Sequence, residues 1–577
     1  MKRKQEAKDN RLRNISLCFL ILAIWLVVQL FRLQIVDHSY YALFASNAHE
    51  IYKKLHPERG QIFFQDTRTG QTYPAAINRQ YYLLYAVPHE IPIENVPSTT
   101  HRLADMLELK DESDIQEINR RLSKTQSYYQ VIEKKIPEET MNKIKSEKIP
   151  GIYFTPQEFR YYPEEELGAA ILGFTSLDDN GVMTGKYGVE GNLNSRLSGK
   201  PGYISGEKTR WGSWITFADR QVTPAENGVD VILTIDRTLQ YQACKRLEEG
   251  RETYEAKSGS LVMMNPKTGA ILAMCSTPGF NPNTYSSVED VSSFNNTSIF
   301  NAYEPGSVFK PITMSIGIDL GLVGPQTTFT ADPCKFFVKG LLKPIENADH
   351  ICYPGANTMT YVLQKSINTG MTWLVDKIGL ENFKSRVEKY GFGKKTGITL
   401  NTEVSGNISS LQRKVNMYYA SFGQGVSVTP LQLAAAYSAL SNDGKVPEPY
   451  VVDQVVYPDG KVEKTKPALS EPVISARTSK LITGMLVATV DSYPEVKLPH
   501  FYVAGKTGTA QIFKNNRLEE KDTNHTISGY APAEDSKIVL VIRYEEPNKK
   551  WAGSTVGVVF KDIVKFALDY YGVPEQR

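Results

Sequence analysis

Three short motifs place serine, lysine and asparagine side chains in an order that could carry out acyl transfer. They are Ser307-Val308-Phe309-Lys310, Ser366-Ile367-Asn368 and Lys506-Thr507-Gly508, in the patterns S-x-x-K, S-x-N and K-T-G. The first motif offers a hydroxyl nucleophile and a lysine that could act as its base. The other two add a second hydroxyl, an amide and a second cation. Together they predict an enzyme that becomes acylated on a serine, with Ser307 as the nucleophile.

None of the three motifs is specific by itself, because the chain matches each of them more than once. The other S-x-x-K begins at Ser205, which we expect in a loop because Gly202 and Gly206 flank it. Two other K-T-G matches begin at Lys267 and Lys395, which we expect in a hairpin turn and just after a helix, respectively. The sequence around each match therefore has to decide. The remaining S-x-N matches begin at Ser293 and Ser405.

The sequence before Ser307 predicts a turn that leads into a helix. Pro305-Gly306 is a typical turn pair, and the residues after Ser307 are compatible with a helix. The unpaired N–H groups and the dipole at a helix amino terminus favour a developing oxyanion. Residues three apart share a helix face, so Lys310 is predicted to reach the Ser307 hydroxyl. A lysine whose pKa is lowered by burial and by a neighbouring cation can act as general base.

Lys506 is predicted to end an apolar strand at residues 501–505, with small residues on both sides. A substrate backbone could lie against such a strand edge as an added strand. Lys506 would attract a substrate carboxylate, and Thr507 would supply a hydroxyl. The backbone N–H groups of Thr509 and Ser307 would form an oxyanion hole, where the loss of one donor typically costs about 3 kcal/mol. The predicted substrate-binding and oxyanion residues are Thr507, Gly508 and Thr509.

Ser366 follows a predicted helical stretch at residues 361–365 and completes the predicted site. Its hydroxyl could pass a proton between the two lysines, and the Asn368 amide could hold a peptide carbonyl of the substrate. His525, downstream of the Lys506 strand, is expected to be structural. The predicted catalytic residues are Ser307, Lys310, Ser366, Asn368 and Lys506.

These motifs need a scaffold, and the hydrophobic pattern predicts one that mixes strands and helices. A strand at 229–235 and a helix at 239–249 precede a hairpin at 260–276, and strands return at 501–504 and 538–544. Sheet segments at both ends of a domain, with helices between them, predict an α+β fold whose first and last strands pair. Helices are predicted at 361–377, 380–390, 430–441 and 558–571.

The part of the chain before residue 229 is predicted to be a separate domain. Residues 59–64 and 81–87 have the pattern of strands, whereas residues 99–147 are charged and helical in period. Residues 39–49 are predicted to continue a helix from the amino-terminal segment. We therefore place the boundary of the catalytic domain near Asn227-Gly228.

The amino terminus predicts a membrane anchor. Residues 14–31 carry no charge and are rich in large apolar side chains, which is just long enough for a helix to cross a bilayer. Six basic residues and only two acidic ones precede this stretch, so the positive-inside rule keeps the amino terminus in the cytoplasm. A cleaved signal peptide is disfavoured, because no A-x-A pattern follows. Everything after about residue 36 is then exported.

The three motifs with their flanking sequences resemble those of class B penicillin-binding proteins, the monofunctional transpeptidases. Gly423-Gln424-Gly425 and Thr429-Pro430-Leu431-Gln432 are similar to late landmarks of that family, and Arg59-Gly60 and Gly188-Val189-Glu190-Gly191 to landmarks of its pedestal domain. One landmark is altered, because Asp66-Thr67-Arg68-Thr69-Gly70 stands where the family usually has Asp-Arg-Asn-Gly. The resemblance covers most of the chain.

The resemblance implies an α+β transpeptidase domain, an antiparallel sheet flanked by helices, behind a pedestal domain and one transmembrane helix. The expected divisions are a cytoplasmic tail at 1–13, an anchor at 14–36, a pedestal at 37–228 and a transpeptidase domain at 229–577. The catalytic domain would lie outside the cell membrane. The pedestal spacing is closer to the septal, cell-division subtype (FtsI-type) than to the elongation subtype.

The resemblance also implies the reaction and its partners. Ser307 would attack the D-Ala-D-Ala amide of a stem peptide, expel D-alanine and pass the acyl group to an amine of a neighbouring stem. β-Lactams would imitate the donor and acylate Ser307. No cofactor is implied. No glycosyltransferase segment is visible, so the expected membrane partners are a SEDS-type glycan polymerase and division proteins.

Three alternatives remain open. A D,D-carboxypeptidase differs in its acceptor alone, whereas a β-lactamase needs neither an anchor nor so long a catalytic domain. A non-catalytic division scaffold is a reading of another class, and the intact motif residues argue against it. The net charge of +3 argues against a nucleic-acid binder, and no cysteine or histidine spacing indicates a metal site. Cys334 and Cys352 are a candidate disulfide in the exported part.

Overall fold

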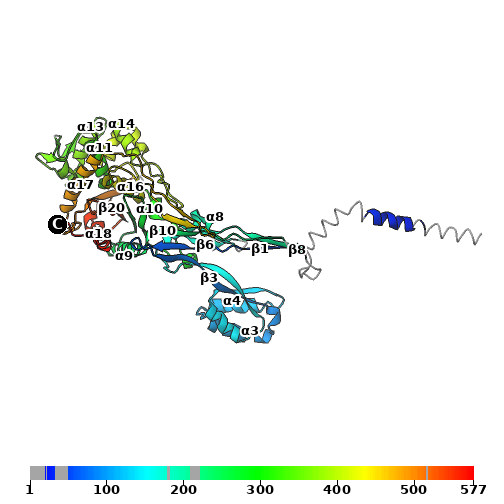
Figure 1. Ribbon diagram of the computed structural model, residues 1–577. Helices are drawn as coiled ribbons and strands as arrows, with labels where there is room; N and C mark the ends of the chain where they lie inside the picture. Colours follow the sequence, from blue (N-terminus) through cyan, green and yellow to red (C-terminus); the bar gives the residue numbers. More distant parts are fainter. Residues whose placement is uncertain are drawn as a thin grey trace, which may run out of the picture. The chain divides into compact units, whose positions relative to one another are not determined.

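A computed structural model describes residues 20, 22–32, 50–178, 182–207, 221–329, 331–514 and 517–577. The chain forms two compact units, Met1–Glu58 with Gly199–Gly228 and Arg59–Ser198 with Val229–Arg577. The smaller unit contains an antiparallel sheet of β1 (Glu50–Leu55), β8 (Gly202–Glu207) and β9 (Gln221–Thr223) (Figure 1). The prediction that Ser205 lies in a loop is wrong, because this residue pairs with Tyr52 inside β8. The predicted helix at residues 39–49 lies outside the described residues.

Part of the predicted anchor at residues 14–36 is described. Residues 22–31 are helical, and their large apolar side chains are exposed, for example Leu22 at 55% and Trp25 at 57%. Within the described segments, no helix combines the length and the apolar character that a membrane crossing needs. Residues 14–19, 21 and 33–36 of the predicted anchor lie outside these segments.

Residues 72–161 form a small layer of helices that packs on a sheet. The strands β3 (Thr72–Ala86), β4 (Gln130–Ile136) and β5 (Ile152–Tyr161) pair in the order β4-β3-β5. Their buried face packs with α3 (Val96–Met106), α4 (Glu112–Leu122) and α5 (Glu138–Ser146) around Leu84, Leu103 and Ile144. The region at 99–147, which was predicted to be helical, thus contains the strand β4. The sequence did not predict this strand, because its apolar residues are few and charged residues interrupt them.

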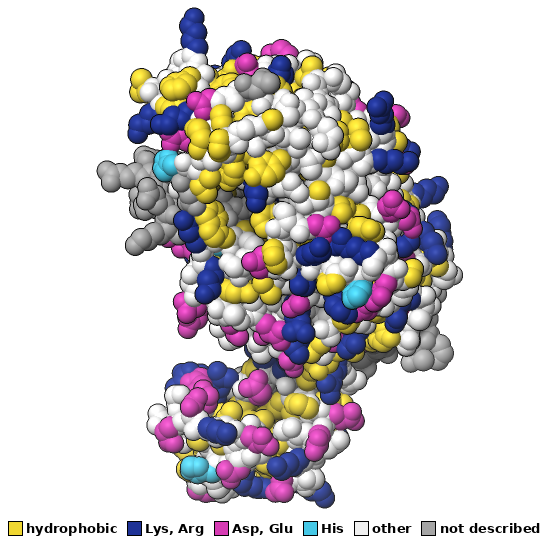
Figure 2. All heavy atoms as spheres, turned by 90° about the vertical axis from the view of Figure 1, so that its left-hand side faces the viewer, with side chains coloured by type: hydrophobic (Ala, Val, Ile, Leu, Met, Phe, Trp, Pro, Cys, Tyr) yellow, Lys and Arg dark blue, Asp and Glu magenta, His cyan; other side chains and the backbone are white. Residues whose placement is uncertain are grey.

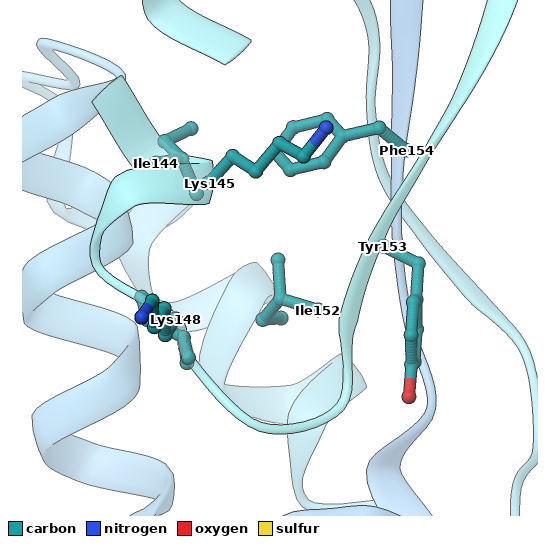
Figure 3. Close-up of a pocket in the computed structure, with 7 residues that line it drawn as sticks. Ile144, Lys145, Lys148, Ile152, Tyr153 and Phe154 are labelled. Atoms are coloured by element: carbon teal, nitrogen blue, oxygen red, sulfur yellow. The ribbon is translucent and has the colours of Figure 1, made fainter. Parts of the chain in front are cut away.

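A pocket of about 250 Å³ opens between α5 and β5. Figure 3 shows that the Lys145 side chain crosses this pocket toward the ring of Phe154. None of the residues that line it belongs to the three motifs, so this pocket is separate from the predicted site. The lining residues are Ile144, Lys145, Lys148, Ile149, Ile152, Tyr153 and Phe154.

A five-stranded sheet forms the centre of the catalytic part, in the order β12-β11-β21-β20-β19. Its strands are β11 (Ser258–Met264), β12 (Ile271–Thr277), β19 (Ala504–Lys514), β20 (Arg517–Ala531) and β21 (Ile538–Glu545). The last strand, β21, pairs antiparallel with β11 of the predicted hairpin and not with the strand predicted first, at 229–235, so the prediction that the first and last strands pair is wrong. Lys267 lies in the turn between β11 and β12, as predicted.

Alternation along β11 divides the core into two layers, because successive side chains of a strand point to opposite faces. Leu261 and Met263 pack with α9 (Arg237–Thr253) and α18 (Val556–Tyr570), whereas Val262 and Met264 face the helices on the other side. Those helices include α11 (Lys310–Asp319), α16 (Pro430–Ser441) and α17 (Ala476–Asp491). The predicted α+β arrangement of a sheet between helices is thus present (Figure 1).

The predicted strand at 229–235 is β10 (Asp230–Asp236), and it belongs to a different sheet. It pairs in parallel with β2 (Ile62–Gln65) and antiparallel with β17 (Val452–Val456). This sheet joins the segment after Arg59 to the segment after Gly228, and the boundary near residue 228 stays a prediction. The shorter elements are η2 (Pro88–Glu90), η3 (Ile93–Asn95), α6 (Ala169–Leu172), β6 (Phe174–Leu177), β7 (Met183–Lys186), α7 (Gly188–Asn192), α8 (Asn194–Leu197), η4 (Pro282–Ser287), η5 (Val291–Phe294), α10 (Thr297–Phe300), β13 (Thr328–Phe329), β14 (Lys335–Phe336), β15 (Ile345–Glu346), η7 (Ala348–His350), β16 (Asn357–Thr358), η8 (Ser409–Gln412), α15 (Lys414–Ala420), β18 (Val462–Lys464) and η9 (Ala552–Ser554).

The predicted helix at 361–377 is broken in two. It consists of α12 (Met359–Gln364) and α13 (Asn368–Ile378), and α14 (Leu380–Lys389) follows. The break is at Ser366, whose φ of 56° is incompatible with a right-handed helix. Lys395 follows α14, as predicted.

Four cysteines form two disulfides. The candidate pair Cys334–Cys352 is a disulfide and closes a loop between the first two motifs. A second pair, Cys244–Cys275, links α9 to β12 and was not predicted, because the sequence separation of 31 residues gives no indication that the two meet.

In the space-filling view, basic and acidic side chains are interspersed over the visible face (Figure 2).

Candidate active site

Ser307 lies in a short 3-10 turn, η6 (Gly306–Phe309), that runs directly into α11. The turn needs Gly306, because its φ of +59° is a conformation that other residues rarely adopt. Gly306 N donates to Gly423 O at 3.0 Å, and Tyr437 OH on α16 donates to Val308 O at 2.6 Å. Ser307 is therefore held at the amino end of a buried helix, where the sequence predicted it.

Hydrogen bonds connect the first motif to the second. Ser366 Oγ donates to Ser307 Oγ at 2.9 Å, and Lys310 Nζ donates to Ser366 Oγ at 3.1 Å and to Asn368 Oδ1 at 2.8 Å. Lys310 Nζ also donates to the backbone oxygen of Ser366. The lysine thus reaches the Ser307 hydroxyl through Ser366, whereas the sequence predicted a direct contact.

The turn that carries Ser366 is strained and firmly held. A left-handed φ at a non-glycine residue costs of order 1–3 kcal/mol and tends to occur at functional sites. Asn368 Nδ2 donates to Glu346 O at 3.1 Å, and Thr369 N donates to Asn347 Oδ1 at 3.1 Å. Glu346 and Asn347 belong to the loop that the Cys334–Cys352 disulfide closes. Both ends of the Asn368 amide are engaged within the protein, so its contact with a substrate carbonyl stays a prediction.

The third motif lies on β19, which is an edge strand of the five-stranded sheet. The strand begins at Ala504, so the prediction that Lys506 ends a strand is wrong and the lysine instead lies near its start. A Cβ atom on Gly508 would come within 3.0 Å of Pro305 O and Val308 N. Glycine at this position therefore allows β19 to run against the turn that carries Ser307. Thr509 Oγ1 accepts from Ala552 N at 3.2 Å, which fixes the strand on its other side.

Two buried lysines dominate the electrostatics of the site. Lys310 is 0% exposed, and burial together with the nearby charge of Lys506 holds its pKa well below the usual value. Burial lowers the pKa of Lys506 to about 7. Lys506 Nζ donates to Thr507 O at 2.9 Å. A lysine whose pKa is lowered by burial gives up its proton more readily and can then take one from a hydroxyl, whereas an ordinary lysine stays charged.

Other residues support this arrangement without belonging to any motif. Thr526 Oγ1 on β20 donates to Tyr303 OH at 3.0 Å, and the Arg543 guanidinium lies 4.6 Å from the Tyr303 ring centroid. His525 is buried, its Nδ1 lies 2.8 Å from Thr555 Oγ1, and burial lowers its pKa to about 4. These contacts are structural in kind, and a single sequence gives no signal for them. Across the segments described, no group of three or more His, Cys, Asp or Glu side chains is arranged to hold a metal ion.

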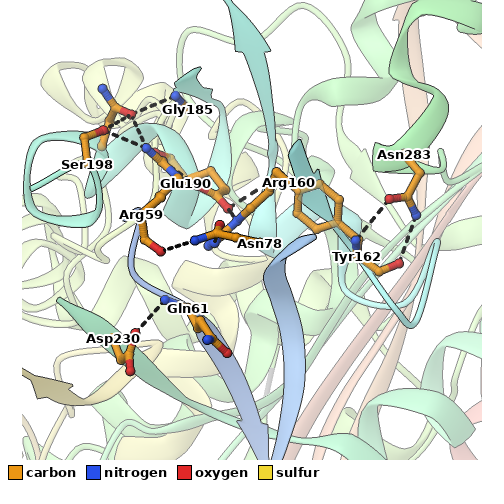
Figure 4. A network of polar contacts seen from close by, with 11 residues as sticks. Arg59, Gln61, Asn78, Arg160, Tyr162, Gly185, Glu190, Ser198, Asp230 and Asn283 are labelled. Carbon is orange, nitrogen blue, oxygen red and sulfur yellow. Dashed lines mark hydrogen bonds and ion pairs between the residues drawn. The ribbon is translucent and has the colours of Figure 1, made fainter. Parts of the chain in front are cut away.

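The pedestal landmarks meet in a buried ion-pair network (Figure 4). Glu190 is 0% exposed and accepts from Arg160 Nε at 2.6 Å and from Arg59 Nε at 2.9 Å. Burial would raise the pKa of Glu190, but the charges of Arg160 and Arg59 outweigh it and hold this pKa below its usual value. Glu190 therefore balances one of the two buried positive charges, and neutral oxygens of Asn78, Asn194 and Ser198 accept further hydrogen bonds from the two arginines.

Comparison with known proteins gives matches along most of the chain. Residues 259–565 match the penicillin binding protein transpeptidase domain, and residues 54–233 match the penicillin-binding protein dimerisation domain. Stage V sporulation protein D of Bacillus subtilis is 30% identical over 541 residues, which is 90% of this chain and 79% of that protein. A probable peptidoglycan D,D-transpeptidase PenA of Neisseria meningitidis is 24% identical over 99% of this chain and 94% of that protein.

Solved structures show the same fold. Penicillin binding protein 2X from Streptococcus thermophilus superposes with a TM-score of 0.73 at 23% identity, covering 90% of this chain and 80% of that one. Penicillin binding protein 3 from Mycobacterium tuberculosis in complex with aztreonam superposes with a TM-score of 0.69 at 22% identity. The superposition covers 91% of this chain and 98% of that one.

Proposed function

The chain belongs to the class B penicillin-binding proteins, with a dimerisation domain before a transpeptidase domain, and from this premise we propose how it cross-links peptidoglycan. Its activity is that of a serine-type D,D-transpeptidase. The observation that carries the mechanism is the chain of hydrogen bonds from Lys310 through Ser366 to Ser307, beside the edge strand β19.

In the acylation step, deprotonated Lys310 is the base, because loss of the hydrogen that Nζ gives to Ser366 Oγ leaves a lone pair directed at that oxygen. Hydroxyl hydrogens rotate about their C–O bonds, so the same three heavy atoms can carry the Ser307 proton through Ser366 to Lys310. Ser307 Oγ then bonds to the carbonyl carbon of the D-Ala-D-Ala amide. The C–N bond breaks, and the proton passes from Lys310 to the nitrogen of the departing D-alanine. The N–H groups of Ser307 and Thr509 would stabilise the oxyanion between these events.

Substrate binding is assigned to β19, whereas the proton relay is assigned to Lys310 and Ser366. The donor peptide would extend along β19 as an added strand, since an edge strand offers unpaired backbone groups. Protonated Lys506 and the Thr507 hydroxyl would receive its carboxylate. Gly508 supports this assignment, because a side chain there would push the strand away from the Ser307 turn.

The second step transfers the acyl group to an amine of another stem peptide. The amine attacks the ester carbon, its proton returns through Ser366 and Lys310, and the Ser307 hydroxyl is restored. A β-lactam would open on Ser307 in the same way and remain attached, because its ring-opened acyl group loses no fragment.

The location and partners are finer proposals. Residues 14–36 would anchor the chain in the cell membrane with residues 1–13 in the cytoplasm, the pedestal at 37–228 and the transpeptidase domain at 229–577 outside. The exposed apolar side chains of residues 22–31 and the basic residues before them support this. A SEDS-type polymerase and division proteins would be the membrane partners. The relatives include an FtsI homolog and a stage V sporulation protein, so a septal role is tested by the location of a fluorescent fusion of this chain. Fluorescence at the division septum would support a septal role, and fluorescence confined to forespores would contradict it.

Labelling with a fluorescent penicillin tests the proposed reaction. The wild-type chain should form a stable adduct, and Ser307→Ala should form none. Incubation with a D-Ala-D-Ala pentapeptide and an amine acceptor should then give cross-linked product. Loss of D-alanine without cross-linking would indicate a carboxypeptidase, and rapid loss of the label would indicate a β-lactamase. Absence of any label would support a non-catalytic scaffold.

A further inference from the structure

The connection between α17 and β19 carries a tyrosine that none of the three motifs contains. Tyr493 follows the end of α17 at Asp491, and its backbone is fixed on both sides. Tyr493 N donates to Val490 O, and Tyr493 O accepts from Val496 N and Lys497 N, each at 3.0 Å. The tyrosine side chain therefore projects from a rigid base.

The phenol hydroxyl of Tyr493 holds the end of the helix that precedes Ser366. It donates to Gln364 O at 2.9 Å, and Gln364 is the last residue of α12. Carbonyl groups at the end of a helix have no donor within the helix, so this contact satisfies one of them. Gln364 Nε2 in turn donates to Ala488 O on α17 at 3.0 Å. The segment just before the strained Ser366 turn is thus tied to α17 at Ala488 and to the α17–β19 connection at Tyr493.

The same ring lies beside the third motif. Lys506 Nζ is 6.0 Å from the centroid of the Tyr493 ring. Burial raises the pKa of Tyr493, so its hydroxyl keeps the hydrogen that it donates to Gln364 O. The Tyr493 side chain thus contacts the end of α12 through its hydroxyl and lies beside Lys506 through its ring.

We propose that Tyr493 is a positioning residue that fastens the Ser366 turn to the Lys506–Thr507 strand and so aligns the proton relay with the donor carboxylate. The inference rests on the proposed function, in which Ser366 carries the proton and Thr507 receives the carboxylate. It predicts two different effects when the hydroxyl is lost. The Ser366 turn loosens, which slows acylation, whereas the ring stays beside Lys506, so substrate binding is not weakened.

The test is Tyr493→Phe in the full-length chain, with acylation by a fluorescent penicillin followed over a range of concentrations. Loss of one hydrogen bond should lower the maximal acylation rate constant about 3- to 10-fold. The half-saturating concentration should stay the same, because the ring beside Lys506 is kept, and the melting temperature should stay close to that of the wild type. Tyr502→Phe is the matched control, because Tyr502 lies in the same connection and is 40% exposed. It should leave both kinetic constants unchanged.

The outcomes separate the inference from the function on which it rests. If Tyr493→Phe keeps the wild-type rate constant, or raises only the half-saturating concentration, the positioning role is wrong and the transpeptidase function stands. If the rate falls only in proportion to the folded fraction seen in melting, Tyr493 is merely structural and the inference is again wrong. A wild-type chain that is not acylated on Ser307 would contradict the proposed function and the inference together.

Discussion

Glu190 in the pedestal and Lys310 in the catalytic domain are both 0% exposed, but their surroundings differ in kind. Glu190 has two arginine partners, so its charge is compensated and its pKa is lowered. Lys310 lies near a second cation, Lys506, and across the described segments neither lysine forms an ion pair. A buried carboxylate held by opposite charges keeps its charge, whereas a buried lysine without a counter-ion favours its neutral form. The first arrangement maintains a structure, and the second supplies a base.

The largest expected effect is on activity. Lys310→Met removes the base and keeps the length of the side chain, so acylation should slow by about 10²- to 10⁴-fold. The melting temperature should not fall, because burying the Lys310 amine is itself unfavourable and methionine of similar length removes that penalty. Penicillin-acylation kinetics and thermal melting measure the two quantities. Lys365→Met, at an exposed lysine next to Ser366, is the control and should acylate normally.

A substitution in the pedestal should have the opposite signature. Glu190→Gln leaves Arg59 and Arg160 buried without a counter-ion, which should lower the free energy of unfolding by about 3–5 kcal/mol. The acylation rate constant of the folded fraction should stay unchanged. Denaturant unfolding provides the measurement. Glu226→Gln, which breaks the exposed pair with Lys200, is the control and should leave unfolding unchanged. If Glu190→Gln and Glu226→Gln lowered the free energy of unfolding equally, the contrast between the buried network and the catalytic lysines would be wrong.

The smallest expected effect is a pH dependence of stability. Because the pKa of Lys506 is about 7 when folded and about 10.5 when unfolded, the unfolded state binds one more proton between these values. The lysine therefore penalises folding below about pH 7, and stability recovers toward pH 10.5 with a slope of at most about 1.4 kcal/mol per pH unit. Lys506→Met should reduce this slope in denaturant unfolding measured from pH 7 to 10. An unchanged slope would show that Lys506 does not titrate near 7.

Much of the site could be predicted because its residues lie in local patterns. The turn before Ser307, the helix after it and the hairpin around Lys267 follow from neighbouring residues alone. The proline-glycine pair and the strand alternation encode them within a few positions. The sequence around Ser205 also showed that this S-x-x-K does not begin a helix. The loop predicted there is wrong, however, because Ser205 lies in a strand that pairs with a distant segment.

The rest depends on contacts between residues far apart in the sequence. The break at Ser366 results from tertiary packing that overrides a continuous helical pattern. Tyr437, Tyr303 and Tyr493 support the site through single hydrogen bonds to segments 129 or more residues away, and no local pattern encodes such pairs. The Cys244–Cys275 bond is of the same type. Strand β10 also joined another sheet than expected, because its partner β2 precedes it by about 170 residues.

The account depends on Ser307 being the residue that the Lys310–Ser366 relay activates. Peptide mapping by mass spectrometry after reaction with benzylpenicillin tests this directly, in the wild type and in Lys310→Met. The account predicts one adduct, on the peptide that contains Ser307, and a strongly reduced amount of it in the variant over the same time. An adduct on any other serine, or equal acylation of Ser307 without Lys310, would contradict it.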